Sequence, residues 1–420
     1  MKQKYFRITL LLAVLFVIYA WGASFGAFKG EYIVLRQLNR LFAAMGFLFF
    51  FVQFVLASRI KLLEKGFGQD KMIGLHRLLG RIALGFLLLH PFFFFLYQGE
   101  VVVENVFRVI GIVILLGLIV TAAVASLYKK LNLPYELWLH VHKVNYVLFP
   151  LVLIHVFYNA LPGTLLYYLW VAFAVLFAAL ILYKVLREII IRKVPYEVVE
   201  VKKEAKDIWS LYFKGRPLPY DPGQFMYLRL VRNGKVSSSH PFTISSSPTR
   251  ELLSVTPKEL GDFTATVKDT QVGDQAYIDA PYGVFSYLNY DCKKMMFLAG
   301  GIGITPFMSM LRYMYDKKSE KPVTLLWGNK NEEMLCFQEE LNRMEREMKH
   351  LKIVYVMSRQ EDWPGETGRI DRKMIEKYTE NMSDYDFFVC GPPPMSKAAL
   401  EALGEMGIPQ KKIHHELFEF

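Results

Sequence analysis

Cysteine is scarce in this chain of 420 residues. It has three cysteines, and all of them lie in the second half of the sequence, at Cys292, Cys336 and Cys390. A small secreted fold held by disulfide bonds needs a larger and evenly paired set. The sequence therefore excludes a disulfide framework. Internal repeats and low-complexity tracts are also lacking, which excludes a solenoid or a largely disordered chain.

Hydrophobic residues make up 53% of the chain, and many of them lie in six long stretches that contain few charged side chains. These stretches are residues 8–28, 41–58, 74–97, 106–127, 139–158 and 164–186. Each approaches the roughly 20 residues that a helix needs to cross a bilayer. After Lys193 the composition becomes that of an ordinary globular protein. The sequence predicts six membrane-spanning helices followed by a soluble half.

Acidic residues are outnumbered, and the net charge of +11 could indicate a nucleic-acid partner. The basic residues are instead confined to alternate loops and both ends of the apolar half: Lys2, Lys4, Arg7, Arg59, Lys61, Lys65, Lys71, Lys129, Lys130, Arg187, Arg192 and Lys193. The intervening loops carry Glu31, Glu100 and Glu104, with Lys29 as their clear cation. This is the positive-inside pattern. We expect a multi-pass protein of the plasma membrane, in contact with lipid, with both termini in the cytoplasm and no nucleic-acid partner.

The first apolar stretch also resembles a secretory signal peptide, with a basic head and small residues near its end. The five further stretches and the regular charge alternation favour a first helix that is retained in the membrane.

Four histidines lie inside the apolar stretches, where a polar ring is costly without a partner. The third stretch holds His76 and His90, and the fifth holds His142 and His155. Fourteen residues advance about 21 Å along a helix and thirteen advance about 20 Å, so the two helices offer histidines at two matched depths. The expected pairs are His76 with His142 and His90 with His155.

The helical phase of the fifth stretch is less favourable than its depth. His142 and His155 are thirteen residues apart. At about 100° per residue, an ideal helix would point the second side chain about 140° away from the first. We therefore predict a distortion of this helix at Pro150, which lies between the two histidines. His140 is an alternative ligand, because fifteen steps miss by only about 60°.

Zinc and copper sites built on two histidines usually need further donors. Cysteine, aspartate and glutamate are absent beside these histidines, whereas a haem needs two axial ligands and supplies four nitrogens itself. Two b-type haems are the predicted cofactors, and hydrogen bonding by isolated histidines is the alternative. The haem propionates need cations, for which Arg40 and Arg59, at the outer and inner ends of the second stretch, and Arg77 and Arg81 are suitably placed. The alternative role for each arginine is snorkelling at a helix end.

The soluble half begins with short alternating runs such as "YEVVEVKKEAKDIWSLYFKG", which are typical of antiparallel strands in a small barrel. After Asp291 strands and helices alternate, which predicts a parallel sheet with ligands at the carboxyl ends of its strands. The run "GGIGITP" follows one such strand, and its glycines and the next helix N-terminus suit a pyrophosphate. "CGPPPM" follows the last strand, at the same edge of the sheet. Either motif alone could be a structural turn.

Taken together, the motifs "HPFTISS", "GDFT", "AGGIGITPFMS", "CGPPPM" and "ELFEF" resemble the flavin reductase module of the NADPH oxidase and ferric reductase transmembrane family. The six-stretch half with paired histidines resembles the membrane domain of the same family. The resemblance covers nearly the whole chain and is closest to short bacterial NADPH oxidases, which lack an EF-hand extension. It implies a six-helix haem-binding bundle at 1–192, an antiparallel β-barrel FAD domain at 193–289, and an α/β NAD(P)H domain at 290–420, the last two resembling ferredoxin–NADP reductase.

The resemblance also implies roles for individual residues. FAD would be held by His240, Pro241, Phe242 and Thr243, with Thr243 near the flavin N5, and its pyrophosphate would be bracketed by Gly261, Asp262, Phe263 and Thr264. The NAD(P)H phosphates would contact Gly300, Gly301, Gly303, Thr305 and Pro306. Cys390, Gly391 and Pro392 would border the nicotinamide. Phe420 would stack on the flavin and yield to the nicotinamide; the alternative is an aromatic residue tucked into the core.

"SRQ" at 358–360 resembles the pattern in which Ser358 and Arg359 hold the 2′-phosphate of NADPH, because a guanidinium suits a phosphate. "WGNKN" after the preceding strand lacks an arginine, so NADH remains open as a second reductant.

The resemblance implies that electrons pass from NADPH through FAD and two haems to an acceptor on the outer face. Dioxygen, giving superoxide, is the first candidate, and ferric or cupric ion is the second. Two alternatives are a haem-binding membrane sensor with a reductase-like module and a flavin reductase on an unrelated anchor. The sequence indicates no obligatory protein partner.

Overall fold

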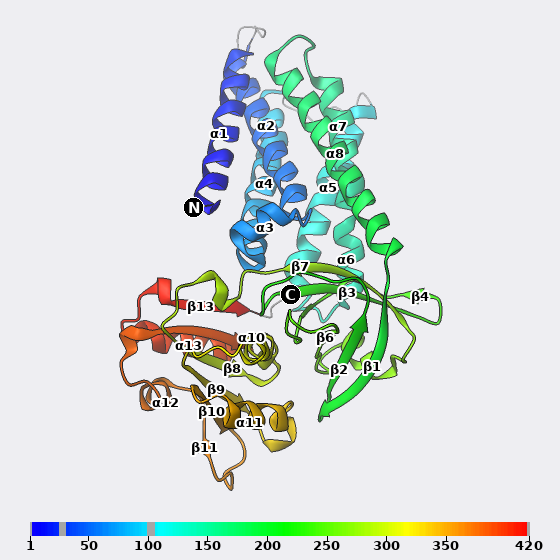
Figure 1. Ribbon diagram of the computed structural model, residues 1–420. Helices are drawn as coiled ribbons and strands as arrows, with labels where there is room; N and C mark the ends of the chain where they lie inside the picture. Colours follow the sequence, from blue (N-terminus) through cyan, green and yellow to red (C-terminus); the bar gives the residue numbers. More distant parts are fainter. Residues whose placement is uncertain (1, 25–30, 99–105, 418–420) are drawn as a thin grey trace. The chain divides into compact units, whose positions relative to one another are not determined.

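The computed structural model describes residues 2–24, 31–98 and 106–417, and the chain divides into two units (Figure 1). Unit 1 comprises Met1–Phe67 and Lys71–Arg187, and unit 2 comprises Gly68–Asp70 and Glu188–Phe420. Each unit has its own apolar core and is described separately.

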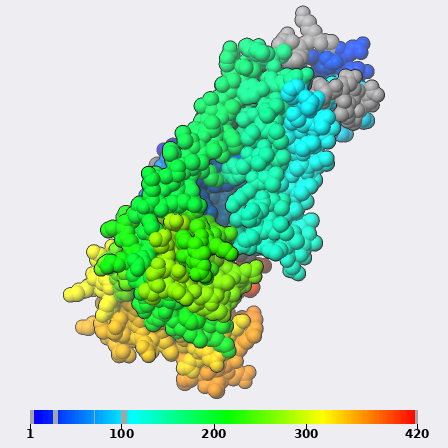
Figure 2. All heavy atoms as spheres, turned by 90° about the vertical axis from the view of Figure 1, so that its right-hand side faces the viewer, coloured from blue at the N-terminus to red at the C-terminus, as the bar shows by residue number. Residues whose placement is uncertain are grey.

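Unit 1 is helical, and six of its segments are long and apolar enough to cross a membrane: Tyr5–Ala23, Ile33–Leu56, Lys71–Gln98, Val106–Leu127, Tyr135–Asn159 and Leu165–Lys193. The helices are α1 (Lys2–Ala23), α2 (Ile33–Leu56), α3 (Lys61–Phe67), α4 (Gln69–Gln98), α5 (Val106–Leu127), α6 (Tyr135–Lys143), α7 (Asn145–Asn159) and α8 (Leu165–Lys193). The six predicted spans are confirmed. In Figure 2, α5 (cyan) and α8 (green) lie at the surface. Apolar side chains on these helices, such as Val113 and Leu176, are exposed, as expected of lipid-facing helices.

Helix α2 lies at the centre of the bundle. Its Phe47 and Phe54 rings pack against Phe149 of α7, which is fully buried, at centroid distances of 5.1 and 4.9 Å. The helix begins at Ile33, earlier than the predicted start at residue 41. Its first turns carry polar residues that lower the hydropathy there, yet Gln37 and Asn39 are buried inside the bundle.

The predicted distortion of the fifth span occurs, but its predicted position was wrong. Pro150 lies within α7, and the helix is interrupted at Val144, between α6 and α7. The side-chain amide of Asn145 donates a hydrogen bond of 2.8 Å to the carbonyl oxygen of His142, and the Thr121 hydroxyl donates to the Asn145 Oδ1 atom at 3.3 Å. A local side chain thus satisfies a carbonyl that a continuous helix would pair internally, which ends α6.

Unit 2 begins with an antiparallel sheet of seven strands: β1 (Tyr196–Ala205), β2 (Ile208–Lys214), β3 (Phe225–Arg232), β4 (Lys235–Val236), β5 (His240–Thr243), β6 (Leu253–Val255) and β7 (Gln275–Tyr282). The strand order is β4-β3-β7-β1-β2-β6, and β5 pairs with β3. An isolated bridge between Ile244 and Val255 links the end of β5 to β6 and closes the sheet into the predicted barrel.

The rest of unit 2 is a parallel sheet in the order β11-β10-β9-β8-β12-β13. Its strands are β8 (Lys294–Gly300), β9 (Val323–Asn329), β10 (Leu351–Met357), β11 (Glu366–Thr367), β12 (Tyr385–Gly391) and β13 (Ile413–Leu417). Helices α10 (Thr305–Asp316) and α11 (Gln338–Glu347) cover one face, and α12 (Arg372–Lys377) and α13 (Pro393–Glu405) cover the other. The predicted fold class, a helical membrane domain followed by a barrel and an α/β domain resembling ferredoxin–NADP reductase, is confirmed.

Candidate functional site

His90 of α4 and His155 of α7 face each other in unit 1, with ring centroids 6.5 Å apart and ring planes at 80°. The Nδ1 atom of His90 lies 3.1 Å from the carbonyl oxygen of Asn39, and that of His155 lies 2.9 Å from the carbonyl oxygen of Phe107. An imidazole that donates from Nδ1 keeps its Nε2 lone pair for a metal. Gly111 of α5 makes room for this arrangement, because a Cβ atom there would lie 2.8 Å from the His155 ring.

His76 of α4 and His142 of α6 form the second facing pair, with ring centroids 5.8 Å apart. The His76 ring lies near the backbone of Gln53 in α2. The His142 Nδ1 atom is buried and has no hydrogen-bond partner among the described residues. His140, the alternative ligand, is exposed and bonds to its own helix through the carbonyl oxygen of Glu136. The geometry therefore favours His142.

These two pairs suit an iron atom that brings its own nitrogen donors. Metal–imidazole bonds of roughly 2 Å on either side of one iron place the two ring centroids roughly 6 Å apart, which agrees with both pairs. The described residues contain no cluster of three or more histidine, cysteine, aspartate or glutamate side chains that could hold a bare metal ion. The histidines thus fit axial ligation of haem, and their role as ligands remains a prediction.

The arginines proposed for the propionates differ in position. Arg40 lies in the first two turns of α2, half-buried and next to Asn39, whose carbonyl oxygen faces His90. Arg59 follows α2 in the left-handed backbone region, with φ of 55°, and its carbonyl oxygen accepts a 3.0 Å bond from Arg187. Arg77 and Arg81 are exposed.

The predicted flavin motif forms β5 of the barrel in unit 2. His240 stacks on Phe263 with a centroid distance of 4.0 Å, so "HPFT" and "GDFT", which are distant in sequence, lie side by side. The Thr243 side chain is 6% exposed, and its hydroxyl has no hydrogen-bond partner among the described residues. A buried hydroxyl left without a partner fits a residue that bonds to a bound flavin.

Gly261, Asp262, Phe263 and Thr264 form the start of the short helix α9 (Asp262–Ala265). The Thr264 hydroxyl accepts hydrogen bonds from the backbone N–H of Leu260 at 2.9 Å and of Gly261 at 3.0 Å. The backbone amide of Gly261 is therefore already occupied within the loop, which weakens its predicted contact with a pyrophosphate.

The glycine loop and the "CGPPPM" turn pack directly against each other at the carboxyl ends of β8 and β12. A Cβ atom on Gly303 would lie 2.4 Å from the carbonyl oxygen of Cys390, so only glycine fits there. Gly301 has a φ of 51°, a conformation that also favours glycine. Thr305 and Pro306 begin α10 immediately after this loop, as predicted. The structure therefore brings together the residues predicted to hold the nucleotide phosphates and those predicted to border the nicotinamide.

Cys390 is fully buried at the end of β12 and is paired in register with Glu416 of β13. Glu416 is itself 8% exposed, and the sequence analysis missed this buried acidic residue beside Cys390. Glu416 could have been found from the sequence, because it is the first residue of the terminal "ELFEF" motif. Phe420, predicted to stack on the flavin, lies outside the described residues.

Ser358 and Arg359 follow β10 and are both exposed. The Ser358 hydroxyl donates a 3.0 Å hydrogen bond to the carbonyl oxygen of Asn329, so it is already engaged in this arrangement. The backbone N–H of Arg359 bonds to the carbonyl oxygen of Lys330 at 2.9 Å. Lys330 thus lies next to Arg359 and is a second cation that the sequence analysis missed, because it considered only arginine after β9.

Three families match successive parts of the chain. Residues 42–153 match the family described as "Ferric reductase like transmembrane component", residues 192–293 match the "FAD-binding domain", and residues 297–401 match the "Oxidoreductase NAD-binding domain".

Curated relatives match about half of the chain. The flavohemoprotein of Bacillus subtilis is 27% identical over 238 residues, which cover 53% of this chain and 59% of the relative. The glycine betaine monooxygenase reductase subunit of Chromohalobacter salexigens is 28% identical over 231 residues, covering 52% of this chain and 62% of the relative. The chain thus spans about three-fifths of the length of these relatives.

Among solved structures, the flavohemoglobin from Malassezia yamatoensis with bound FAD and heme is similar in fold. Its TM-score is 0.52 at 20% identity, covering 92% of this chain and 96% of that one.

Proposed function

We propose a specific electron path for this chain, which has the NADPH oxidase and ferric reductase-like architecture and is a multi-pass membrane oxidoreductase that takes electrons from NAD(P)H. Electrons enter from NADPH in unit 2 and leave from unit 1 to dioxygen, which takes one electron to become superoxide. When bound, FAD supplies a two-electron acceptor that releases electrons singly, and two b-type haems supply one-electron carriers within the bundle. The two facing histidine pairs of unit 1 carry this proposal.

The residues of unit 1 hold and orient the iron ligands. The carbonyl oxygens of Asn39 and Phe107 fix the tautomer and ring orientation of His90 and His155. His76 and His142 provide the same pairing at the other depth of helix α4. Arg40 and Arg59 are proposed to bind propionates.

The residues of unit 2 bind and align the nucleotides. His240 and Thr243 hold the flavin, and the Gly300–Pro306 loop receives the phosphates of NADPH. Cys390 is buried at the adjoining strand end, where it excludes water from the nicotinamide. Arg359 and Lys330 supply positive charge for the 2′-phosphate, which favours NADPH over NADH.

Ferric ion is a second candidate acceptor. The match of residues 42–153 to a ferric reductase-like component supports it. The resemblance of the sequence motifs to those of NADPH oxidases supports dioxygen as the first candidate.

The charge pattern of the loops supports a location in the plasma membrane with both termini and unit 2 on the cytoplasmic side. No obligatory protein partner is part of this proposal.

The experiment that tests the proposal measures haem and acceptor reduction in purified chains. The wild-type chain should contain two haems, and anaerobic NADPH should reduce first the flavin and then the haem, as followed near 450 nm and in the Soret band. His155→Ala should lose one haem and stop superoxide formation while flavin reduction continues. His140→Ala is the matched control, because His140 is exposed, and it should keep both haems.

A wild-type chain without Soret absorbance would refute the haem assignment. Oxygen consumption and superoxide yield, compared with the rate of ferric chelate reduction, decide the acceptor. Faster reduction of the chelate than of dioxygen would replace the first candidate by the second.

A further inference from the structure

One face of helix α10 is bonded to the barrel segment that follows the flavin strand. The Ser309 hydroxyl donates a 2.6 Å hydrogen bond to the carbonyl oxygen of Ser246, and Arg312 donates one of 2.7 Å to that of Ser245. One turn later, Asp316 accepts a 2.5 Å bond from the Thr249 hydroxyl. Residues 309, 312 and 316 are spaced three and four apart and share one helix face. We call Ser309, Arg312 and Asp316, with the segment 245–250, the interdomain seam.

Arg312 is the centre of this seam. Its guanidinium is buried, with 4% side-chain exposure, and binds Glu340 of α11 through two atoms at 3.0 and 2.5 Å. It also lies over the Phe337 ring at 4.9 Å. Since every one of these contacts is directional, the guanidinium has one well-defined position.

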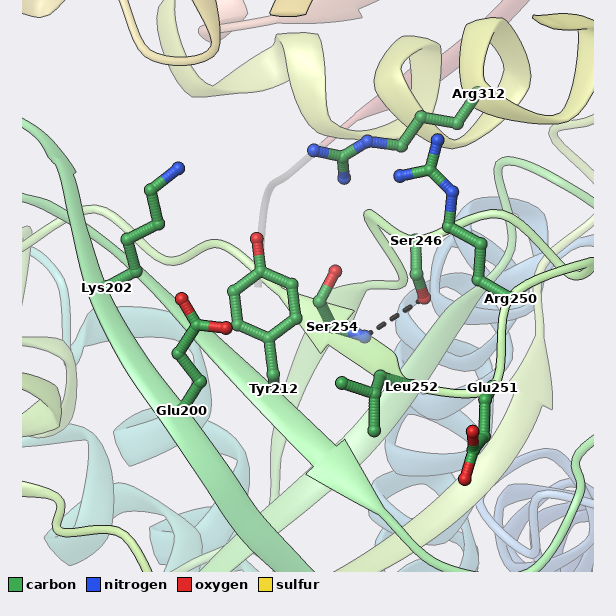
Figure 3. A pocket seen from close by; sticks show the side chains of 9 residues that line it. All are labelled: Glu200, Lys202, Tyr212, Ser246, Arg250, Glu251, Leu252, Ser254 and Arg312. Atoms are coloured by element: carbon green, nitrogen blue, oxygen red, sulfur yellow. Dashed lines mark hydrogen bonds between the residues drawn. The ribbon is translucent and has the colours of Figure 1, made fainter. Parts of the chain in front are cut away.

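A cavity of about 360 Å³ opens beside the seam, lined by Arg312, Arg250, Ser246, Tyr212 and residues of β1 and β6. Figure 3 shows Arg312 extending from α10 into this space, toward the barrel strands that carry Tyr212 and Ser254. Apolar packing between α10 and these strands is therefore interrupted here. The polar bonds of the seam hold α10 against the barrel where side-chain packing does not.

The seam connects the two parts of unit 2 on which nucleotide chemistry depends. Ser245 and Ser246 follow Thr243, the proposed flavin contact, by two and three residues. Helix α10 begins at Thr305, directly after the glycine loop that is proposed to hold the NADPH phosphates. From Thr305 to Arg312 the helix is about 10 Å long, a rigid element that transmits any shift at one end to the other.

We propose that Ser309 and Arg312 are positioning residues that fix the distance between the flavin strand and the nucleotide loop. This inference rests on the proposed function in unit 2 and is independent of the acceptor and of the haem assignment. Neither residue touches the nucleotides; each acts through the carbonyl oxygens of Ser245 and Ser246. A misplacement of about 1 Å between reacting groups can cost about 100-fold in rate, so loosening the seam should slow hydride transfer more than binding.

The test uses the full-length chain with its flavin bound. Arg312→Lys keeps the buried charge that Glu340 requires but loses the planar fork, and Ser309→Ala removes one hydroxyl without leaving a charge unpaired. Arg343→Lys on the exposed side of α11 is the matched control. Flavin content, the dissociation constant for NADP⁺, the anaerobic rate of flavin reduction by NADPH, and amide hydrogen exchange are measured for each chain.

Arg312→Lys should keep its flavin and an NADP⁺ dissociation constant within about twofold of wild type, while the rate of flavin reduction falls about 10- to 100-fold. Ser309→Ala should show a smaller fall in the same direction, and Arg343→Lys none. Dithionite, which does not bind the nucleotide loop, should reduce the flavin equally fast in every chain. Amide exchange in 244–249 and 300–305 should rise together in Arg312→Lys.

An unchanged flavin reduction rate in both seam variants would overturn the inference. Loss of flavin in proportion to lost rate in both variants would also overturn it, because the seam would then serve folding only. If NADPH fails to reduce the wild-type flavin, the proposed function fails. Amide exchange then still decides whether Arg312 couples the two segments, and unaltered exchange in either segment would reject that coupling.

Discussion

Gly111 is the residue that allows the His155 imidazole to reach its place opposite His90. An alanine Cβ at this position would lie 2.8 Å from Cε1 and 3.1 Å from Nδ1 of that ring. Because Nδ1 is bonded to the Phe107 carbonyl oxygen, the ring cannot move without losing this bond.

Gly111→Ala should therefore shift the imidazole and destabilise the bundle by about 1–3 kcal/mol, the usual cost of overpacking. We expect an altered or reduced Soret signal and a lower unfolding temperature. Gly85→Ala is the matched control, since a Cβ atom there has no neighbour within 4 Å. Equal spectra and stability in the two variants would show that Gly111 makes no room for a ligand.

Arg359 and Lys330 should set the preference between the two nicotinamide nucleotides. A charge-assisted hydrogen bond contributes about 1.5–3 kcal/mol, so Arg359→Ala should raise the KM for NADPH about 10- to 100-fold and that for NADH much less. Lys330→Ala should have a smaller effect in the same direction. Equal changes in the KM for NADPH and for NADH would show that these side chains do not bind the 2′-phosphate.

For single residues, the sequence predicted how deep the histidines lie along the membrane helices better than it predicted their hydrogen-bond partners. His76, His90, His142 and His155 could be paired from spacing alone, because depth along a helix follows directly from residue count. The Asn39 and Phe107 acceptors could not be predicted, since a main-chain carbonyl leaves no mark in the residue type. Arg359 was visible as a phosphate ligand, whereas Lys330 needed the backbone pairing of two strand ends.

Among the elements, the interruption between α6 and α7 decides whether His142 and His155 face the same helix. An unbroken helix would place them about 140° apart. Asn145 holds the interruption through the carbonyl oxygen of His142.

Asn145→Ala should leave the carbonyl oxygen of His142 without this hydrogen bond, at a cost of about 1–3 kcal/mol, while the Thr121 hydroxyl keeps its bond to the carbonyl oxygen of Leu118. We expect a lower haem-to-protein ratio, with the His142 site affected first. Ser126→Ala, which removes a side-chain hydrogen bond to the carbonyl oxygen of Ala122 on the exposed face of α5, is the control. A full complement of haem in Asn145→Ala would show that the interruption does not depend on this side chain.

The ion pair between Arg312 of α10 and Glu340 of α11 should make the unfolding free energy of unit 2 depend on pH. Burial alone would raise the pKa of Glu340, but the hydrogen bonds and charge of Arg312, together with Arg250, outweigh it and hold the pKa below its usual value of 4.5. A carboxyl group with a lowered pKa in the folded state stabilises the protein above its unfolded pKa and loses that effect as pH falls through the folded pKa.

The unfolding free energy of the wild type should therefore fall more steeply between pH 6 and pH 3.5 than that of Glu340→Gln. Tryptophan fluorescence in denaturant measures both. Glu339→Gln, an exposed change on the same helix, should follow the wild type. Parallel curves for all three chains would contradict a lowered pKa at Glu340.

The helices and strands were largely predictable from the sequence, with two exceptions. The span at 106–127 coincides with α5, because its apolar run ends where the helix ends. Pro150 suggested the wrong place for the distortion, since a proline within a membrane helix can be accommodated by neighbouring helices, while Asn145 competes actively for a backbone carbonyl. The start of α2 was missed because buried Gln37 and Asn39 look like loop residues in a hydropathy profile.

For the whole molecule, the orientation of the helices can be tested with the existing cysteines in place. Cys292, Cys336 and Cys390 are all buried, so they should react slowly with a maleimide. Burial also raises the pKa of Cys292 to about 12, which lowers its thiolate fraction further.

Leu131→Cys, next to Lys129 and Lys130, should lie on the cytoplasmic side, and Leu161→Cys should lie outside; both side chains are exposed, at 60% and 38%. A membrane-impermeant maleimide applied to intact cells should label only the second. Labelling of Leu131→Cys before permeabilisation would reverse the orientation.

The presence of an apolar helical half followed by a reductase-like half could be predicted, because hydrocarbon admits so few alternatives to a helix. The closure of the barrel could not. It depends on the isolated bridge between Ile244 and Val255 and on bonds between Ser245 and Ser254, and single pairs of this kind carry no periodic signal.

The anchors of His90 and His155 belong to the peptide backbone, and this affects how the chain can evolve. Every amino acid carries a carbonyl, proline included, so a replacement at position 107 leaves the acceptor in place. A replacement at position 39 also keeps the acceptor but removes the side-chain amide that donates a 2.6 Å hydrogen bond to the carbonyl oxygen of His90. A carbonyl also does not titrate, so these hydrogen bonds give the ligands no protonation step of their own. Mutational drift at position 107 would therefore change the shape around the His155 imidazole before it changed the chemistry of that ring.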